Sequence, residues 1–306
     1  MSAVPRVSVL LPVRDGERHL REAVESILAQ TFDDLEVVAL DDGSGDGTPA
    51  ILADLASRDA RVRVERRARK GLTTALNDAA RVAVGSYLAR MDADDVAAPD
   101  RLERQVVFLD ENPKVAVVGG AYEVIDDDGR VTRAVRFPTG DDAIRRTMRR
   151  RNCILHSTVM MRADAFSEAG GYRLDQAEDY DLWLRIGRRS RLANLPDVVL
   201  RYRRHAEQYS VEQIELQTLG ALIARRAAEI RRRGGDDGLE GRVDREVAHR
   251  LGIDDGAIDR QIRRDAIRLA SRLRANGDRE GATALLRATN VGPLARVAAT
   301  ALARLY

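Results

Sequence analysis

Two hydrophobic periods alternate over about the first 120 residues, and this alternation is the feature that most restricts the fold. Compact apolar runs such as Val7–Val13 and Leu35–Leu40 take turns with segments such as Glu17–Gln30, in which apolar residues recur at helical spacing. The alternation is typical of βα units, and near-continuous apolar runs suit strands that are covered on both faces. We therefore predict an α/β fold in which helices flank a mostly parallel sheet.

The same patterns predict further elements along the chain. Strands are predicted at Val62–Glu65, Ser86–Met91, Val115–Gly119, Thr158–Met161 and Val198–Tyr202, a hairpin at Ala121–Arg136, and helices at Thr48–Ser57, Leu72–Val84, Leu102–Asp110, Asp179–Arg188 and from Ala163 onward. After Glu212 arginine-rich amphipathic helical patterns dominate. We predict a first domain at residues 1–210 and a helical C-terminal appendage at residues 211–306.

The composition excludes several classes of protein. A formal net charge of +2 gives no signal for binding a polyanion, so we predict no nucleic-acid partner. The single cysteine, Cys153, excludes an internal disulfide and a cysteine-rich metal site, and it fits a reducing compartment. No window reaches the ~18 consecutive apolar residues of a membrane span, and the N-terminus has no signal-peptide pattern. We predict a cytoplasmic protein.

The first of three acidic clusters is Asp41–Thr48, which directly follows the apolar run Leu35–Leu40. In open parallel sheets ligands bind beyond the carboxyl ends of the strands. Carboxylates there can accept hydrogen bonds from a base or a ribose, and glycines let the backbone approach the ligand. A turn in which Asp46 or Thr48 caps the next helix would explain the same residues. Both interpretations stay open.

The second cluster is Asp92–Asp95, immediately after the predicted strand Ser86–Met91. Carboxylates crowded at a strand end repel one another unless a cation neutralises them. Hard divalent ions prefer such oxygen-rich surroundings and keep substrate phosphates as further ligands. The position of the cluster therefore favours a metal site over the alternative, a solvated acidic loop that caps the helix near Pro99.

The third cluster is Glu178–Asp181, at the predicted start of a helix. Acidic residues in a first helical turn are stabilised by the helix macrodipole, which is one explanation for them. The other is that one carboxylate is the general base that takes a proton from an acceptor hydroxyl.

These clusters, in this order, resemble glycosyltransferase family 2. The resemblance is carried by Leu11–Glu17, Asp41–Ser44, Asp46–Thr48, Gly71, Leu76–Asn77, Ala83, Gly85, Met91–Asp95, Pro99, Arg101–Leu102, Gln105, Leu109, His156–Met160, Gly171–Tyr172, Glu178–Arg185, Tyr202–His205, Gln208 and Ser210. No single segment is decisive, but the ordered set is specific. It spans Val7–Ser210 and leaves the C-terminal part of the chain uncovered.

The resemblance implies a GT-A fold with a Rossmann-like sheet. The implied activity is the inverting transfer of a sugar from a nucleoside-diphosphate sugar to an acceptor hydroxyl, in cell-surface glycan or glycoconjugate synthesis. It further implies Mn²⁺ or Mg²⁺ held by Asp92, Asp94 and His205, and Asp179 as the catalytic base. The residues that it implies for the nucleotide sugar are Pro12, Val13, Arg14, Asp15, Glu17, Asp41, Asp42, Gly43, Lys70, Asn77, Asp92 and Ala93.

Two departures from the family pattern bear on specificity. The first loop reads Val13-Arg14-Asp15, where relatives commonly carry an aromatic residue and asparagine, so the donor is left open. Processive members carry a Gln-x-x-Arg-Trp motif and membrane helices. Here the single tryptophan, Trp183, follows Leu182. A non-processive enzyme is therefore the prediction.

Alternatives from other classes are a sugar nucleotidyltransferase and a non-catalytic scaffold that binds nucleotide sugars. The predicted partners are a nucleotide sugar and a glycan or lipid-linked acceptor. For the C-terminal helices two roles stay open. Arg231–Arg233 and the arginines before them suit contact with the anionic inner face of a membrane. The apolar stripe of Val291–Tyr306 suits docking or a homo-oligomer.

Overall fold

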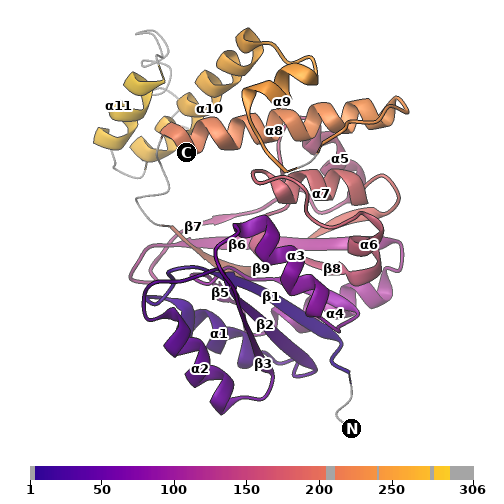
Figure 1. Ribbon diagram of the computed structural model, residues 1–306, viewed down its shortest axis with the longest axis vertical. Coiled ribbons are helices and arrows are strands. Elements are labelled where there is room, and N and C mark those ends of the chain that lie inside the picture. Colours follow the sequence, from indigo (N-terminus) through magenta and orange to yellow (C-terminus); the bar gives the residue numbers. More distant parts are fainter. Residues whose placement is uncertain (1–3, 205–210, 240, 276–278, 290–306) are drawn as a thin grey trace. The chain divides into compact units, whose positions relative to one another are not determined.

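A computed structural model describes residues 4–204, 211–239, 241–275 and 279–289. The chain divides into two compact units, Met1–Arg204 and His205–Tyr306. The division falls after Arg204, a few residues before the boundary that the sequence predicts near residue 210. Figure 1 shows the sheet within the first unit and the helices of the second.

One nine-stranded sheet forms the frame of the first unit, in the order β3-β2-β1-β4-β8-β6-β9-β5, with β7 paired to β6 (Figure 1). The strands are β1 (Val7–Val13), β2 (Leu35–Asp41), β3 (Val62–Arg66), β4 (Tyr87–Arg90), β5 (Val96–Ala97), β6 (Val115–Ile125), β7 (Val131–Val135), β8 (Met160–Arg162) and β9 (Arg191–Arg203). The pairs β1–β2, β1–β4, β2–β3 and β6–β9 are parallel, whereas β8 runs antiparallel between β4 and β6.

The strand register sets the place of the functional residues. Val13 lies opposite Asp41, and Leu10 lies opposite Arg90. Because these strands are parallel, the loops that follow β1, β2 and β4 leave the sheet at the same edge.

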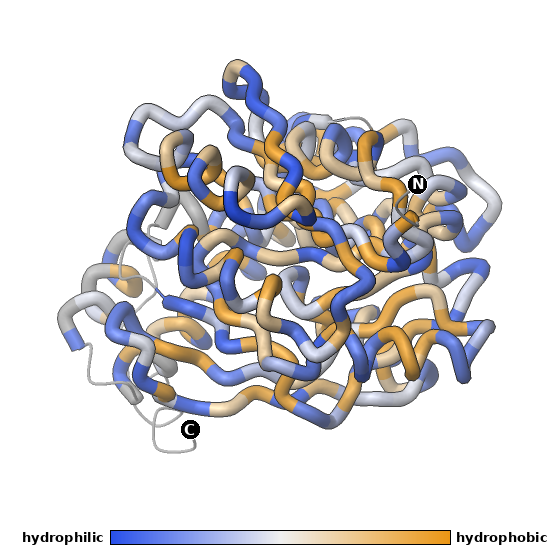
Figure 2. Tube along the Cα trace, turned by 90° about the horizontal axis from the view of Figure 1, so that it is seen from below, coloured by the Kyte–Doolittle hydropathy of each residue, from blue (hydrophilic) through white to orange (hydrophobic). Residues whose placement is uncertain are grey.

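Helices cover the sheet because their apolar residues fall on one side. In α1 (Leu20–Leu28) the buried residues Leu20, Ala23, Val24 and Ile27 follow helical spacing. The other helices of this unit are α2 (Thr48–Arg58), α3 (Leu72–Val82), α4 (Arg101–Glu111), α5 (Asp141–Met148), α6 (Ala163–Glu168) and α7 (Glu178–Ile186), with a 3-10 turn η1 at His156–Thr158. Figure 2 shows apolar strand segments inside and polar loops around them.

The predicted α/β architecture, with helices flanking a sheet, is confirmed, and the differences have physical causes. The strand predicted at Val198–Tyr202 begins at Arg191, because β9 continues through Pro196 and polar residues that conceal its start. The strand β6 runs on to Ile125 and takes in the first arm of the predicted hairpin. The helix α5 is missed because Ile144 and Met148 are its only buried residues.

The second unit is helical, as predicted, with α8 (Val211–Arg232), α9 (Arg245–Arg250), α10 (Asp255–Ala275) and α11 (Arg279–Ala288). Its apolar cluster includes Ala266, Ala270 and Leu285. Arg245 joins three segments of this unit through ion pairs with Glu215, Asp255 and Asp259. Among the described residues, no helix has the length and apolar character that crossing a membrane requires.

A buried arginine ties α4 to the sheet. The side chain of Arg101 is fully buried, and its Nη2 donates to the carbonyl oxygens of Arg90 at 2.8 Å and Val159 at 3.3 Å. Burial lowers the pKa of Arg101 to about 10. The guanidinium thus anchors the end of β4, after which the acidic loop begins.

We expect Arg101→Met to lower the free energy of unfolding by about 2–4 kcal/mol, because two buried carbonyls lose a charged donor. The measurement is urea denaturation followed by circular dichroism. Arg104→Met is the matched control on the same helix. Its side chain is 44% exposed and pairs only with the surface carboxylates of Asp100 and Asp197, so we expect a change below about 1 kcal/mol. Equal unfolding midpoints for the two variants would contradict the anchoring role.

Candidate functional site

Two loops at the edge of the sheet hold each other in place. After β1, the backbone N–H of Asp15 donates to Ser44 Oγ at 3.0 Å. In return the N–H of Gly45 donates to Asp15 Oδ1, and the N–H of Gly47 donates to Glu17 Oε2. The carboxylates of Asp15 and Glu17 therefore build the loop pair itself.

Asp42 organises the loop after β3. Its buried carboxylate accepts hydrogen bonds from Arg67 Nε at 3.0 Å and from the backbone N–H groups of Lys70 and Gly71 at 2.8 Å. Gly43 has φ +80, and a Cβ there would lie 2.9 Å from the backbone nitrogen of Arg69. Only glycine fits this approach.

Asp41 occupies a different environment from its neighbour. Its Oδ1 accepts from the N–H of Ser44 at 2.8 Å, and Arg66 Nε lies 3.2 Å from Oδ2. The Arg66 side chain is 60% exposed, so this edge presents a basic group to solvent beside a buried carboxylate.

The loop after β4 gathers three carboxylates. One oxygen each from Asp92, Asp94 and Asp95 lies within 4.8 Å of the others, which is the spacing of a cation site. Asp95 is fully buried, and burial together with the charges of Asp92 and Asp94 raises its pKa well above the usual range. Its Oδ2 accepts no hydrogen bond from the residues that the structure describes.

Two buried arginines hold this acidic loop. Arg203 donates from its backbone N–H to Asp95 Oδ1 and from Nε to the carbonyl of Asp94, both at 2.9 Å. Arg90, 2% exposed, forms an ion pair with Asp92. Burial alone would lower the pKa of Arg90, but attraction to Asp92 raises it above its ordinary value.

The first turn of α7 carries the third acidic cluster. Asp179 Oδ2 accepts a hydrogen bond from Asn152 Nδ2 at 2.8 Å. Burial raises the pKa of Asp179 to about 6, with Glu178 adding to the rise and His156 opposing it. Asp181 is instead fully buried and bound by Arg173 and Arg185, so its role is structural.

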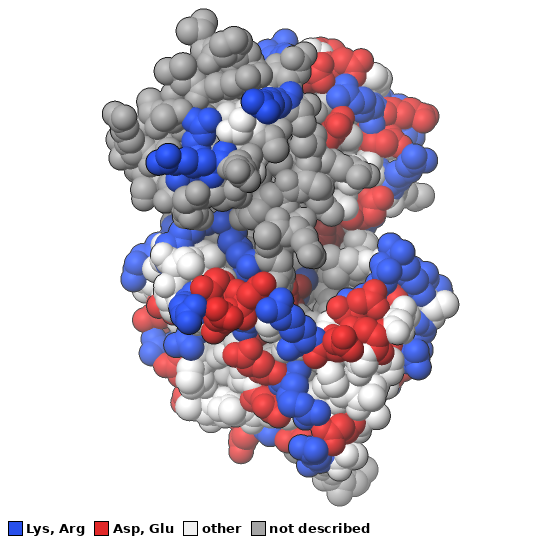
Figure 3. Space-filling view, turned by 90° about the vertical axis from the view of Figure 1, so that its left-hand side faces the viewer, with Lys and Arg blue, Asp and Glu red and all other residues white. Residues whose placement is uncertain are grey.

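Arg90 connects the second and third clusters. It pairs with Asp92, its positive charge opposes the rise that burial causes in the pKa of Tyr172, and it adds to the lowering of the pKa of Glu178 by His156. The charge of one buried guanidinium therefore acts both on the carboxylates after β4 and on those of α7. On the face that Figure 3 draws, acidic side chains form patches with arginine or lysine side chains between them.

Most of the predicted site residues lie along this edge. Pro12 and Val13 end β1 and are buried, Arg14 is exposed, and Ala93 is close to the loop after β1. Asn77 uses its amide to bind the backbone of Tyr172, at 2.9 Å for each contact. His205 lies outside the described residues.

Sequence reasoning missed the residues that hold the site. Arg90, Asn152 and Tyr172 carry no acidic or metal-binding signature, and their partners are distant in sequence. The signal for Arg90 was a charged residue at the end of an apolar strand, directly before the acidic loop.

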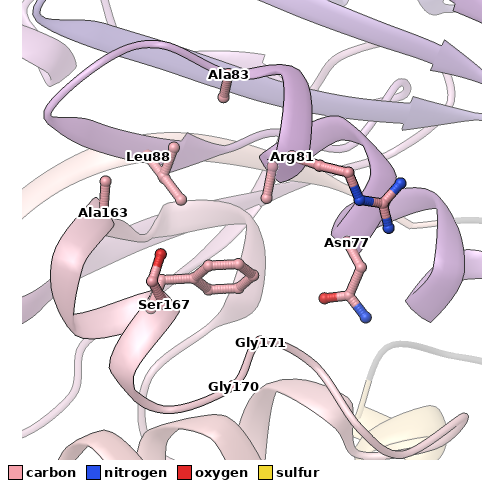
Figure 4. A pocket seen from close by; sticks show the side chains of 10 residues that line it. Asn77, Arg81, Ala83, Leu88, Ala163, Ser167, Gly170 and Gly171 are labelled. Carbon is pink, nitrogen blue, oxygen red and sulfur yellow. The ribbon is translucent and has the colours of Figure 1, made fainter.

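A separate cavity of about 340 Å³ lies between α3 and α6 (Figure 4). Its lining includes Leu88, Phe166, Gly170 and Gly171, and Asn77 faces the turn formed by the two glycines. No acidic residue lines this cavity, so it is distinct from the carboxylate site.

Comparison with known proteins shows which family the chain matches. Residues 8–170 match the family described as Glycosyl transferase family 2. The O-antigen biosynthesis glycosyltransferase WbnJ of Escherichia coli is 32% identical over 205 residues, which cover 65% of this chain and 80% of WbnJ.

Two solved structures share the fold. The mannosyltransferase PcManGT of Pyrobaculum calidifontis, in complex with GDP-Man and Mn²⁺, superposes with a TM-score of 0.59 at 21% identity, covering 100% of this chain and 82% of that one. TarS 1–349 of S. aureus, in complex with UDP-GlcNAc, gives a TM-score of 0.58 at 18% identity, covering 93% and 90%.

We expect Asp42→Asn to loosen the loop after β3, because the amide presents a donor to N–H groups that need an acceptor. The segment Arg66–Lys70 is rich in trypsin sites. Cleavage there should become at least about tenfold faster, which corresponds to a decrease of ~1.4 kcal/mol in the free energy of local opening. Limited proteolysis with mass spectrometry measures it. Asp33→Asn, at an exposed position, is the control. Equal cleavage rates would show that Asp42 does not hold this loop.

Proposed function

Because the chain belongs to glycosyltransferase family 2, we propose that it is an inverting, metal-dependent enzyme that transfers one sugar per encounter from a nucleoside-diphosphate sugar to an acceptor hydroxyl. We place the reaction in cell-surface glycan synthesis, for which the O-antigen role in the name of the relative WbnJ is the support. The family match supports sugar transfer over nucleotidyl transfer.

The observation that carries the proposal is the pair of carboxylate clusters on either side of Arg90. One cluster, Asp92–Asp95, is shaped for a cation. The other presents Asp179, a carboxylate whose pKa of about 6 suits a base near neutral pH. Transfer to a hydroxyl needs both a stabilised leaving group and a proton acceptor.

The residues after β4 fit a hard divalent ion. Three carboxylate oxygens converge, and within the described part of the chain the buried Asp95 Oδ2 has no hydrogen-bond partner. Asp92 and Asp94, with Asp95 beside them, would hold Mn²⁺ or Mg²⁺. When bound, such an ion neutralises these carboxylates and the negative charge that develops on the departing diphosphate.

Asp179 is the residue that we assign to the proton. Its Oδ2 is oriented by Asn152, and its Oδ1 accepts from the N–H of Tyr180 at 2.6 Å. As the acceptor oxygen bonds to the anomeric carbon, the bond from that carbon to the diphosphate breaks, the hydroxyl proton passes to Asp179, and the nucleoside diphosphate leaves. Direct attack from the opposite face inverts the anomeric configuration.

The loops after β1, β2 and β3 are the proposed surface for the nucleoside. Because Asp15, Glu17 and Asp42 are engaged in loop contacts, they would act chiefly by shaping this surface. The Arg66 side chain at its rim and the exposed Lys70 are two of the cationic groups there. Whether the C-terminal helices contact a membrane, an acceptor or a second copy stays a prediction.

The experiment that tests the function is a donor screen that detects nucleoside-diphosphate release in the presence of Mn²⁺ or Mg²⁺. UDP-GlcNAc and GDP-Man open the screen, because fold relatives were solved with them. Metal-dependent release, increased by a glycan acceptor, supports the proposal. Absence of release and of metal-dependent binding for every donor would favour the scaffold alternative.

We expect the rate kcat/KM to fall about tenfold for each pH unit below about 6, because the base acts only when Asp179 is deprotonated and its pKa is raised to about 6. A pH series of initial rates measures this acid limb. Asp179→Asn should lower kcat by about 10²–10⁴ and leave donor affinity nearly unchanged. Full turnover by this variant would exclude Asp179 as the base.

We expect chelation by EDTA to abolish transfer and added Mn²⁺ to restore it. Asp94→Ala should raise the Mn²⁺ concentration for half-maximal activity at least about tenfold, because a carboxylate ligand is lost. Titration of activity with Mn²⁺ measures the change. Asp128→Ala removes an exposed carboxylate outside this cluster and serves as the control. The metal assignment would be wrong if both variants needed the same Mn²⁺ concentration.

A further inference from the structure

His156 is packed between a tyrosine and the helix that carries the proposed base. Its Nε2 lies 2.8 Å from Tyr172 Oη, and its Nδ1 lies 3.3 Å from Glu178 Oε1. The imidazole edge also meets Trp183, with ring centroids 6.0 Å apart at 77°. All these residues lie in the first unit, and the imidazole and Trp183 are buried.

These contacts fix one helix at two points. Glu178 and Trp183 both belong to α7 and lie more than one helical turn apart, so together they set the rotation of the helix. Asp179 lies beside Glu178 in the first turn of α7. The preceding residue, Ala177, has φ 55, a left-handed conformation that is costly for a residue with a Cβ. The surrounding contacts must therefore hold the start of α7 in this form.

The tyrosine hydroxyl selects the form of the imidazole. Burial raises the pKa of Tyr172 far above its usual value, so its hydroxyl keeps its proton. In the neutral imidazole, Nε2 then accepts from Tyr172, and Nδ1 carries the hydrogen that is donated to Glu178. The opposite tautomer would leave a lone pair facing the carboxylate.

Tyr172 is itself fixed from the opposite side. Asn77 of α3 donates to its carbonyl and accepts from its N–H. The residue before α3, Gly71, donates to Asp42 in the proposed nucleoside region. A continuous line of contacts thus runs from the nucleoside side to the start of α7.

We propose that Tyr172 and His156 are positioning residues for Asp179: the tyrosine hydroxyl fixes the imidazole tautomer, and the imidazole holds the first turn of α7 through Glu178. The inference rests on the proposed function, because Asp179 is the base only there. The groups around Asp179 that bear on its charge are Glu178 on α7, His156 on η1 and, around the same cluster, Tyr172, Arg90 and Arg185.

The first test is independent of activity. Histidine ring ¹⁵N spectra of the full chain, which has four histidines, should show one buried Nδ1–H imidazole that is assigned by its loss in His156→Asn. In Tyr172→Phe this resonance should change to a mixture of tautomers. A stable Nε2–H tautomer in the native protein would overturn the proposal.

The second test uses nucleoside-diphosphate release. Tyr172→Phe should lower kcat about tenfold with the donor KM within about twofold, because a base shifted by a fraction of an ångström still permits donor binding. His156→Phe removes the N–H that is donated to Glu178 and should lower kcat by a similar factor. His156→Asn retains an N–H for Glu178, so we expect it to keep most of kcat.

Tyr87→Phe is the matched control. It removes another buried tyrosine hydroxyl, bonded to Asp110 at 2.6 Å, from the first residue of β4. It should leave kcat and the acid limb unchanged. If Tyr172→Phe and His156→Phe match this control while Asp179→Asn is inactive, the positioning role is wrong and the function stands. If Asp179→Asn is fully active, the assignment of the base fails instead, and the positioning role fails with it.

Discussion

The structure of the first unit depends on a balance of charge at the end of β4. Three carboxylates follow one short strand, and buried arginines hold the backbone on which they stand. Arg101 binds the last carbonyl of β4, and Arg203 binds the loop itself. Burying so many ions is costly unless each is paired. The remaining imbalance is centred on Asp95, whose pKa is raised by burial and by the charges of Asp92 and Asp94, and it is the basis on which we propose a cation at this loop.

The polar residues at this edge divide into those that shape the site and those that remain available to a ligand. Asp15, Glu17 and Asp42 each accept backbone hydrogen bonds from a neighbouring loop. Both interpretations of the first acidic cluster are therefore compatible, because carboxylates that close turns also create a rigid rim. A rim that is already organised loses little conformational entropy when a ligand binds.

The fold was predictable where hydrophobic periodicity is strong. The strands β1 and β2 and the helix α1 bury nearly continuous apolar faces, and the first acidic cluster follows β2 directly. Periodicity fails for β9, whose register shifts against β6. It also fails for α5, where charged residues outnumber apolar residues.

The candidate site was predictable only in part. The carboxylates to which we assign the chemistry stand in short motifs that can be recognised along the chain. The residues that support the site do not stand in such motifs. Asn152 and Asp179 are 27 residues apart in the sequence, and Asn77 and Tyr172 are 95 residues apart. Such contacts depend on how the sheet brings α3, η1 and α7 together, which no local pattern encodes.

Backbone strain occurs in the loop after β1 and directly before α7. Among the described residues that are not glycine, Asp15 and Ala177 have positive φ, at 51 and 55. One lies in the loop after β1, where the nucleoside is proposed to bind, and the other directly precedes α7. Such conformations cost on the order of 1–3 kcal/mol each and persist only where neighbouring contacts enforce them. Asp15 is held by Ser44 and Gly45, and the turn at Ala177 by the contacts of His156 with α7. Since strain gives no gain in stability, we propose that its placement beside the proposed nucleoside surface and the proposed base serves the geometry of the proposed reaction.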